Sequence, residues 1–282
     1  MIGRSFQLAP GIGPWRERDL WARGLLDWEA FQANPERSGL PEAMVQLLAA
    51  RIEEARAALA ARDLVGLADL LPAREHWRLY PLFADEAVYL DIETDGRDGG
   101  RPTVVSLFDA GGLHVLLQGQ NLDALPEALG RSRLWVTFNG RCFDLPVLRS
   151  HFPGLPRPAV HLDLRFLCRR VGLPGGLKSV EEAVGVARPP HLRGTNGWDA
   201  VLLWRAWTST GDIEPLRFLV EYNLYDAFQL RSVATCAYNR MVERLAFDAE
   251  RIPRWERGEV LYDVSRILLG LGMAAERVPA AG

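Results

Sequence analysis

Residues that build covalent or zinc-stabilised folds are scarce in this sequence. It has three cysteines and five histidines in 282 residues, and no two cysteines form a CxxC pair. Disulfide frameworks use even sets of cysteines, and structural zinc sites need four clustered sulfur or imidazole ligands. Neither can be the basis of this fold, and the widely spaced Cys142, Cys168 and Cys236 suit a reducing compartment.

Long apolar runs are also missing. No segment approaches the run of about 18 apolar residues that a membrane helix needs, and the first ten residues lack the apolar core of a signal peptide. The composition, 48% hydrophobic and 24% charged, is that of a folded chain. We therefore expect a soluble cytoplasmic protein without a membrane partner.

Lysine is almost absent, since Lys178 is the only lysine among 33 basic residues. The net charge of -3 neither supports nor excludes a nucleic-acid partner, because acidic residues committed to metal ions distort this balance. Arginine binds phosphate through a bidentate fork, so the arginine bias is compatible with such a partner.

Residues 1–82 have the pattern of a helical N-terminal arm. Residues 41–62 carry apolar side chains near a period of 3.6, which predicts one amphipathic helix. Before it, Gly11-Ile-Gly13 and Pro14 predict a tight turn that leads into a short helix. An arm of this size needs to dock on a larger body to be stable.

The Gly11 and Gly13 turn has two interpretations. It resembles half of a helix-hairpin-helix, in which backbone N–H groups at a helix N-terminus bind a phosphate. Alternatively it is an ordinary helix-entry turn, packed through Trp15, Trp21 and Trp28.

From residue 83 strands and helices alternate, which predicts an α/β domain over residues 83–245 and a C-terminal helical extension over residues 246–282. The expected strands are residues 87–93, 103–108, 112–117 and 134–138, and the expected helices are residues 122–129, 144–150, 176–186, 198–210 and 215–245. The stretch Arg251–Arg257 is expected to be a solvated connector.

Carboxylates interrupt this pattern at three places. Asp91 and Glu93 are alternate residues of an apolar strand, so both carboxylates face one way, where they bind a cation or are merely solvated. Asp144 ends Asn139-Gly-Arg-Cys-Phe-Asp144 at a helix start, where a capping role is the alternative. Tyr222 and Asp226 share one helix face at i, i+4 spacing.

In this order the three features resemble the motifs of DEDD 3′-5′ exonucleases of the ribonuclease-H-like superfamily, in the tyrosine-bearing variety. The similarity runs from about residue 75 to residue 235 and is greatest to the bacterial YprB-like branch, which often carries histidine at the position of Tyr222. The blocks that carry it are Tyr89–Gly96, Phe138–Leu148, His161–Leu164 and Leu177–Arg188. The resemblance implies a ribonuclease-H-like mixed sheet flanked by helices.

The resemblance also implies a two-metal mechanism of phosphodiester hydrolysis, which all-oxygen ligands suit because Mg²⁺ and Mn²⁺ are hard ions. It makes Asp91, Glu93, Asp144 and Asp226 the ligands of two Mg²⁺ or Mn²⁺ ions. Glu93 would in addition touch the terminal nucleotide or the nucleophile. Tyr222 would orient the attacking water, since a phenol with a pKa of about 10 is a poor base at neutral pH.

The expected partner is nucleic acid, with single-stranded DNA favoured over RNA. Asn139 and Arg141 lie within the second motif and are candidate substrate contacts, with Gly11 and Gly13 as a second candidate site. Asp163 is interpreted as a strand-end or capping residue. Other functions remain open: an inactive nucleic-acid-binding module on the same fold, an endonuclease, or a structural partner protein.

Overall fold

The computed structural model describes the chain except for residues 98, 187, 246, 254–262 and 273–282. Five strands form one sheet in the order β3-β2-β1-β4-β5. Their bounds are β1 Ala87–Thr94, β2 Pro102–Asp109, β3 Gly112–Leu117, β4 Leu134–Thr137 and β5 Val160–Asp163. β1 pairs antiparallel with β2 and parallel with β4, so the sheet is mixed, and the predicted fold class is confirmed.

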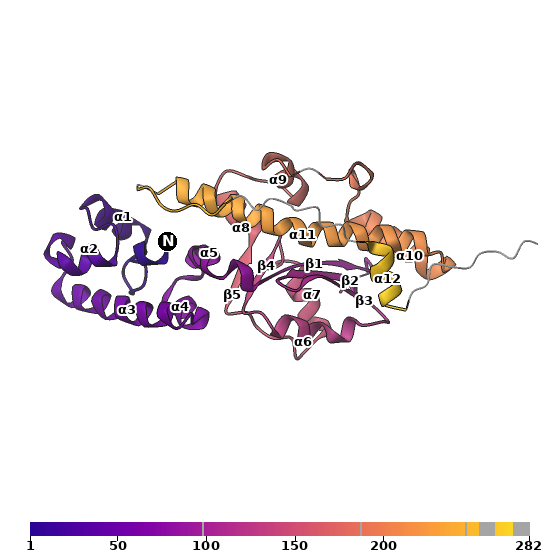
Figure 1. Ribbon diagram of the computed structural model, residues 1–282, viewed down its shortest axis with the longest axis horizontal. Helices are drawn as coiled ribbons and strands as arrows, with labels where there is room; N and C mark the ends of the chain where they lie inside the picture. Colours follow the sequence, from indigo (N-terminus) through magenta and orange to yellow (C-terminus); the bar gives the residue numbers. More distant parts are fainter. Residues whose placement is uncertain (98, 187, 246, 254–262, 273–282) are drawn as a thin grey trace, which may run out of the picture.

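Helices cover both faces of the sheet. The helices of this part are η5 (Leu122–Ala124), α6 (Leu125–Gly130), α7 (Asp144–His151), α8 (Leu164–Arg170), α9 (Leu177–Ala183), η6 (Pro190–Leu192), α10 (Gly197–Thr210), α11 (Ile213–Glu243) and α12 (Val264–Gly270). Figure 1 shows α6 and α7 on one side of the sheet and α10 and α11 on the other. The long α11 is therefore the main cover of one sheet face.

The alternation of β1 explains this arrangement. Val88, Leu90 and Ile92 pack with apolar residues of α6 and α7 in one core cluster. The intervening Tyr89 packs on the other side with Phe108 of β2, which in turn contacts Phe228 of α11. Because side chains alternate along a strand, Asp91 and Glu93 share the α11 side with Tyr89.

The strand β5 and the helix α8 were not predicted. β5 has only four residues, and the segment before it, from Phe152 to Pro158, is rich in proline and glycine and has no period-two pattern. Its pairing with β4, from Leu134 opposite Val160 to Thr137 opposite Asp163, is a tertiary contact that local propensity does not reveal.

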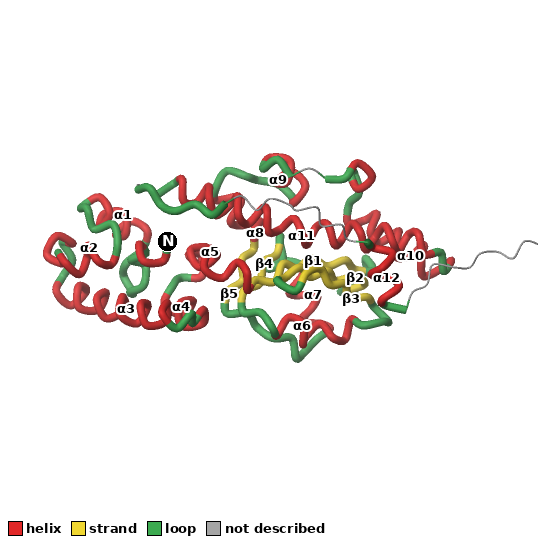
Figure 2. Tube along the Cα trace, viewed as in Figure 1, coloured by secondary structure: helices red, strands yellow, loops and turns green. Residues whose placement is uncertain are grey.

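The regular elements of residues 1–86 are all helices, joined by loops (Figure 2). They contain η1 (Ile2–Arg4), α1 (Pro14–Ala22), α2 (Trp28–Ala33), η2 (Pro35–Ser38), α3 (Glu42–Ala60), α4 (Leu64–Leu70), η3 (Ala73–Leu79), α5 (Tyr80–Phe83) and η4 (Ala84–Glu86). The helical N-terminal extension is thus confirmed, and its core continues without a break into β5, α8 and the end of α11. The division of the chain at residue 82 stays a prediction.

The C-terminal extension is described only in part. Within the described residues beyond 245, α12 is the one helix, and it packs on α10 and α11 through Val264 and Leu268. The predicted connector Arg251–Arg257 falls partly on residues 254–257, which lie outside the described residues. Among the helices that are described, none is long and apolar enough to cross a membrane.

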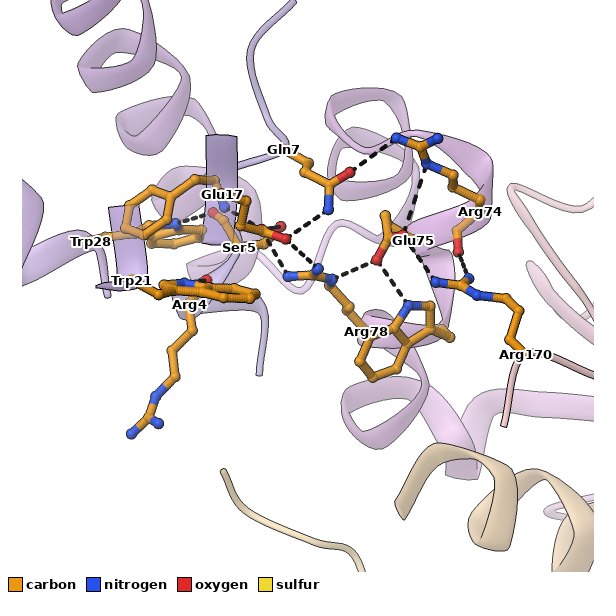
Figure 3. Close-up of polar contacts among 12 residues, drawn as sticks. Arg4, Ser5, Gln7, Glu17, Trp21, Trp28, Arg74, Glu75, Arg78 and Arg170 are labelled. Atoms are coloured by element: carbon orange, nitrogen blue, oxygen red, sulfur yellow. Dashed lines mark hydrogen bonds and ion pairs between the residues drawn. The ribbon is translucent and has the colours of Figure 1, made fainter. Parts of the chain in front are cut away.

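A buried ion-pair network ties the arm together. Arg78 donates to both oxygens of Glu17, at 3.0 and 2.7 Å, and through Nε to Glu75 at 2.9 Å. Glu75 also accepts at 3.1 Å from Arg170, which belongs to α8 (Figure 3). The network therefore joins α1 and η3 of the arm to a helix beside the sheet.

Arg78→Met tests the weight of this network. Removing the guanidinium leaves Glu17 and Glu75 buried without their main partner, and we expect the free energy of unfolding to fall by about 3–5 kcal/mol. Urea denaturation measures this change. The matched control is Arg23→Met, which removes an exposed pair with Asp19 and should cost about 1 kcal/mol or less; equal losses in the two variants would contradict the assignment.

Candidate functional site

Three of the predicted ligands converge where β1 meets α11. One carboxylate oxygen from each of Asp91, Glu93 and Asp226 lies within 4.8 Å of the other two. Asp91 is half-buried, whereas Glu93 and Asp226 are buried. The alternation of β1 and the packing of α11 on this face thus bring together residues more than 130 positions apart in the sequence.

Asp144 reaches the same site from the first turn of α7. Burial raises the pKa of this carboxyl, although the backbone of Asp144 itself and that of Ile92 on β1 act to lower it. Phe143, not Asp144, occupies the N-cap position of α7, and this cap has no side-chain hydrogen bond. The capping alternative for Asp144 is therefore wrong, and its side chain lines the same cavity as Asp91 and Glu93 of β1.

The four acids line one cavity of about 460 Å³. Its other walls come from the ends of β1 and β4, the turn after β4, and the first residues of α9 and α10. These lining residues are Ile92, Thr94, Phe138, Asn139, Phe143, Leu177, Gly197 and Tyr222. Tyr222 and Asn139 thus lie at the acidic site, as the sequence predicts, although their roles stay predictions.

Burial of like charges dominates the electrostatics of this cavity. Burial, followed by the charges of Asp226 and Asp144, raises the pKa of both Asp91 and Glu93 well above the ordinary value. Burial also raises the pKa of Asp144 to about 7. Without a compensating cation, these carboxyl groups stay protonated at pH values at which they would be ionised in water.

Arg188 supplies positive charge at one side of the site. Its guanidinium forms an ion pair with Asp226 and bonds both oxygens of Glu181 on α9, at 2.7 and 3.1 Å. Burial opposes the charge on Arg188, but Asp226 and Glu181 outweigh it and raise its pKa. In the sequence Arg188 is the last residue of a motif block, and no role was predicted for it. No local sequence pattern indicates that this arginine contacts α11.

Two further side chains at the site were missed. Asn223 donates at 2.7 Å to Oδ2 of Asp91 and so fixes the orientation of that carboxylate. Lys178 places its ammonium 5.2 Å from the ring centroid of Tyr222, and burial followed by the charge of Arg188 lowers its pKa. Asn223 precedes Asp226 by three residues on α11, so helical spacing indicated that the two side chains lie on one face. For Lys178 the sequence offered no signal other than its being the only lysine.

Other predicted contacts lie elsewhere. Arg141 lines a neighbouring cavity at β5 instead of the acidic one, and its guanidinium stands 5.5 Å from the ring centroid of Phe166. Gly11 and Gly13 line a third cavity on the arm, where Gly13 is the N-cap of α1. Binding of phosphate at this glycine turn stays a prediction.

The interpretations of Asp163 and of the tryptophans can be compared with the structure. Asp163 ends β5 and caps α8, and it also accepts from the backbone N–H groups of Asn139 and Arg141 at 2.8 and 2.9 Å, so its structural role is confirmed.

Trp21 and Trp28 are buried as packing residues, but Trp15 is 71% exposed and packs no turn.

The donor set fits a hard divalent cation. Every candidate ligand is a carboxylate, and neither histidine nor cysteine lines this cavity. Mg²⁺ and Mn²⁺ prefer oxygen ligands, and their charge would offset the repulsion that raises these carboxyl pKa values. A cation bound to Asp226 would take over part of the neutralisation that Arg188 provides.

These raised carboxyl pKa values predict how stability depends on pH. The folded protein retains protons that the unfolded chain releases above about pH 4, so the metal-free protein should lose stability as the pH rises from 4 to 7. For a carboxyl with the pKa of Asp144 the loss is up to about 4 kcal/mol. Added Mn²⁺ should stabilise the protein more at pH 8 than at pH 5, because protons compete with it.

Unfolding temperatures from pH 5 to 8, with EDTA or with Mn²⁺, measure both effects. Asp144→Asn should flatten the metal-free pH dependence, whereas the exposed Asp123→Asn should leave it unchanged. A pH dependence that is identical in Asp144→Asn and in the unmodified protein would contradict the shift assigned to this carboxyl.

Comparison with known proteins identifies a family. A family model described as the RNase H superfamily matches residues 88–238, which is more than half of the chain. The matched region runs from β1 into α11 and contains Tyr222 and all four carboxylates of the cavity. No curated protein matches the chain.

Proposed function

The chain belongs to the RNase H superfamily, and from this we propose that it is a 3′-5′ exonuclease that degrades single-stranded DNA with two Mg²⁺ or Mn²⁺ ions. Membership of this superfamily indicates a nuclease, and hence a hydrolase that acts on nucleic acid. The end specificity, the sugar, and the identity and number of the ions are the proposed parts.

The observation that carries the proposal is the convergence of the motif residues on one cavity. Asp91, Glu93 and Asp226 have carboxylate oxygens within 4.8 Å of one another, and Asp144 and Tyr222 line the same cavity. Three buried acids and a half-buried fourth are costly to maintain without a function that uses their charge. Their shared orientation toward one space supports cation-dependent chemistry there.

Asp91, Glu93, Asp226 and Asp144 would hold the ions in this proposal. Bound divalent cations supply a nucleophilic hydroxide near neutral pH and stabilise charge on the phosphoryl and leaving oxygens. Asn223 keeps Asp91 directed into the cavity through its 2.7 Å hydrogen bond. Glu93, which opens on the same space, would also contact the terminal nucleotide or the attacking water.

Tyr222 acts as a hydrogen-bond donor in this account. Burial, followed by the charges of Asp226, Glu93 and Asp91, raises the pKa of its phenol far above neutrality. The hydroxyl therefore stays protonated, and it can orient a water molecule but cannot take a proton from it. Lys178, which stands over the Tyr222 ring, adds positive charge where a substrate phosphate would lie.

The size of the cavity supports an exonuclease over an endonuclease. A volume of about 460 Å³ lies within the range of small-ligand pockets, about 300–1,000 Å³, and suits one terminal nucleotide better than a continuous duplex. Retention of all four acids supports the enzyme over an inactive binding module on the same fold. Asn139, at the cavity wall, is a proposed contact of the terminal nucleotide.

Substitution of the ligands should abolish the activity. We expect Asp91→Ala and Asp226→Asn each to eliminate Mn²⁺-dependent shortening of 5′-labelled single-stranded DNA, because each removes a ligand oxygen from the cluster. Gel electrophoresis of the products, with EDTA and Asp123→Asn as controls, measures the loss. Full activity in either ligand variant would refute the site assignment, and cleavage of circular single-stranded DNA would favour the endonuclease.

Tyr222→Phe should slow the reaction without abolishing it. The variant loses the hydroxyl that orients water but keeps every acid, so we expect kcat to fall by about 10- to 100-fold, the lower range for a positioned catalytic group, with metal affinity unchanged. Single-turnover digestion and Mn²⁺ titration measure the two quantities separately. An unchanged rate would remove Tyr222 from the mechanism.

A further inference from the structure

Two adjacent cavities lie beyond the acidic site. The larger, of about 560 Å³, lies between α1, η3, α8 and the end of α11, and the smaller, of about 280 Å³, lies at the edge strand β5. Arg74, Trp77 and Arg170 line both, and the two neighbouring cavities are together called the groove below. Its near end reaches Arg141, in the same turn as Asn139, which lines the acidic cavity.

Positive charge dominates this groove although the whole chain has a net charge of -3. Five arginines and two glutamates line the larger cavity. Figure 3 shows that both glutamates are held by Arg78, which lies between them. Glu75 also pairs with Arg170 at 3.1 Å and approaches Arg74 at 3.9 Å, but two carboxylates can offset only two of the five guanidinium charges, so the lining keeps a net positive charge.

The arginines at the rim are accessible. The side chain of Arg74 is 57% exposed, and its polar contacts with other described side chains are a 3.3 Å hydrogen bond to Gln7 and a 3.9 Å contact with Glu75. Arg18 is exposed on α1, and Arg244, at the end of α11, uses one Nη to bond the backbone carbonyl of Arg170. Each of the three retains N–H groups that can reach a phosphate.

An aromatic side chain marks the end of the groove nearest the acidic cavity. Phe166 is 40% exposed on α8 and lines the smaller cavity beside Arg141, whose guanidinium lies 5.5 Å from its ring centroid. An exposed ring flanked by arginine is the combination on which unpaired bases stack while their phosphates are neutralised.

We propose that this groove binds the single-stranded part of a nucleic acid whose end occupies the acidic cavity. The inference rests on the proposed function, because it uses the acidic cavity as the place of the chain end. Phe166 and Arg141 hold the nucleotides nearest that end, and Arg74, Arg18 and Arg244 hold phosphates farther along. The arm is then a substrate-binding part of the enzyme.

Fluorescence anisotropy in EDTA tests the groove without requiring catalysis. The probes are labelled oligothymidylates of 4 and 16 nucleotides, with oligouridylate of 16 for comparison of the sugar. The test protein is Arg18→Gln/Arg74→Gln/Arg244→Gln, and the matched control replaces three exposed arginines elsewhere, Arg97, Arg131 and Arg217. Unfolding temperatures verify that both triple variants are folded.

We expect the groove variant to bind the 16-mer at least about tenfold more weakly. The slope of log K against log salt concentration should also become less steep by about 2, because three phosphate contacts are lost and each contact on a single strand contributes about 0.7. Binding of the 4-mer should be unchanged, and the control should resemble the unmodified protein. Phe166→Ala should weaken binding of both lengths. Equal affinities of the groove variant and the control for the 16-mer would overturn the proposal.

The outcomes separate this inference from the proposed function. Length-dependent binding that the groove variant loses, together with no digestion in Mn²⁺, would support the groove and refute the exonuclease. Digestion that is equally fast for 4-mer and 16-mer in both triple variants would support the exonuclease and refute the groove. Binding of a polyglutamate peptide in place of both nucleic acids would also refute it and indicate an acidic protein partner.

Discussion

Four carboxylates gathered around one cavity are the constraint on which the rest of this structure depends. Like charges in a low-dielectric site repel, and the protein offsets this with Arg188 at Asp226, with Asn223 at Asp91 and with retained protons. These devices leave the acids able to exchange their partners for a cation. The same arrangement that costs stability at neutral pH would, under the proposed function, prepare the site for metal-dependent chemistry.

The arm depends on a second buried charge cluster of a different kind. Glu17, Arg78 and Glu75 satisfy one another with short hydrogen bonds, and Arg170 extends the cluster to α8 (Figure 3). Because these charges are paired, the cluster fixes position and has little capacity to bind a ligand. Through Arg170 the cluster joins η3 to α8, and the groove proposed to bind nucleic acid lies between these elements.

Local sequence patterns predicted most of the elements, and the family resemblance predicted that the three acidic motifs belong to one site. The alternation of β1 placed Asp91 and Glu93 on one face, and helical spacing placed Tyr222 with Asp226, because both depend on one element only. β5 and the role of Arg188 were missed, since each is determined by residues distant in the sequence, β4 for the strand and α11 for the arginine. Arg141 was expected to contact the substrate; it lines the adjoining cavity and not the acidic one, and the contact stays a prediction.

Crystals grown with Mn²⁺ would test the central claim, that the acidic cavity is a metal site, most directly through anomalous diffraction. The account predicts anomalous density bounded by Asp91, Glu93, Asp226 and Asp144, with Arg188 shifted from Asp226 toward Glu181 alone. Anomalous density that is absent at saturating Mn²⁺, with Arg188 still paired to Asp226, would contradict it and make the cluster a structural feature of the fold.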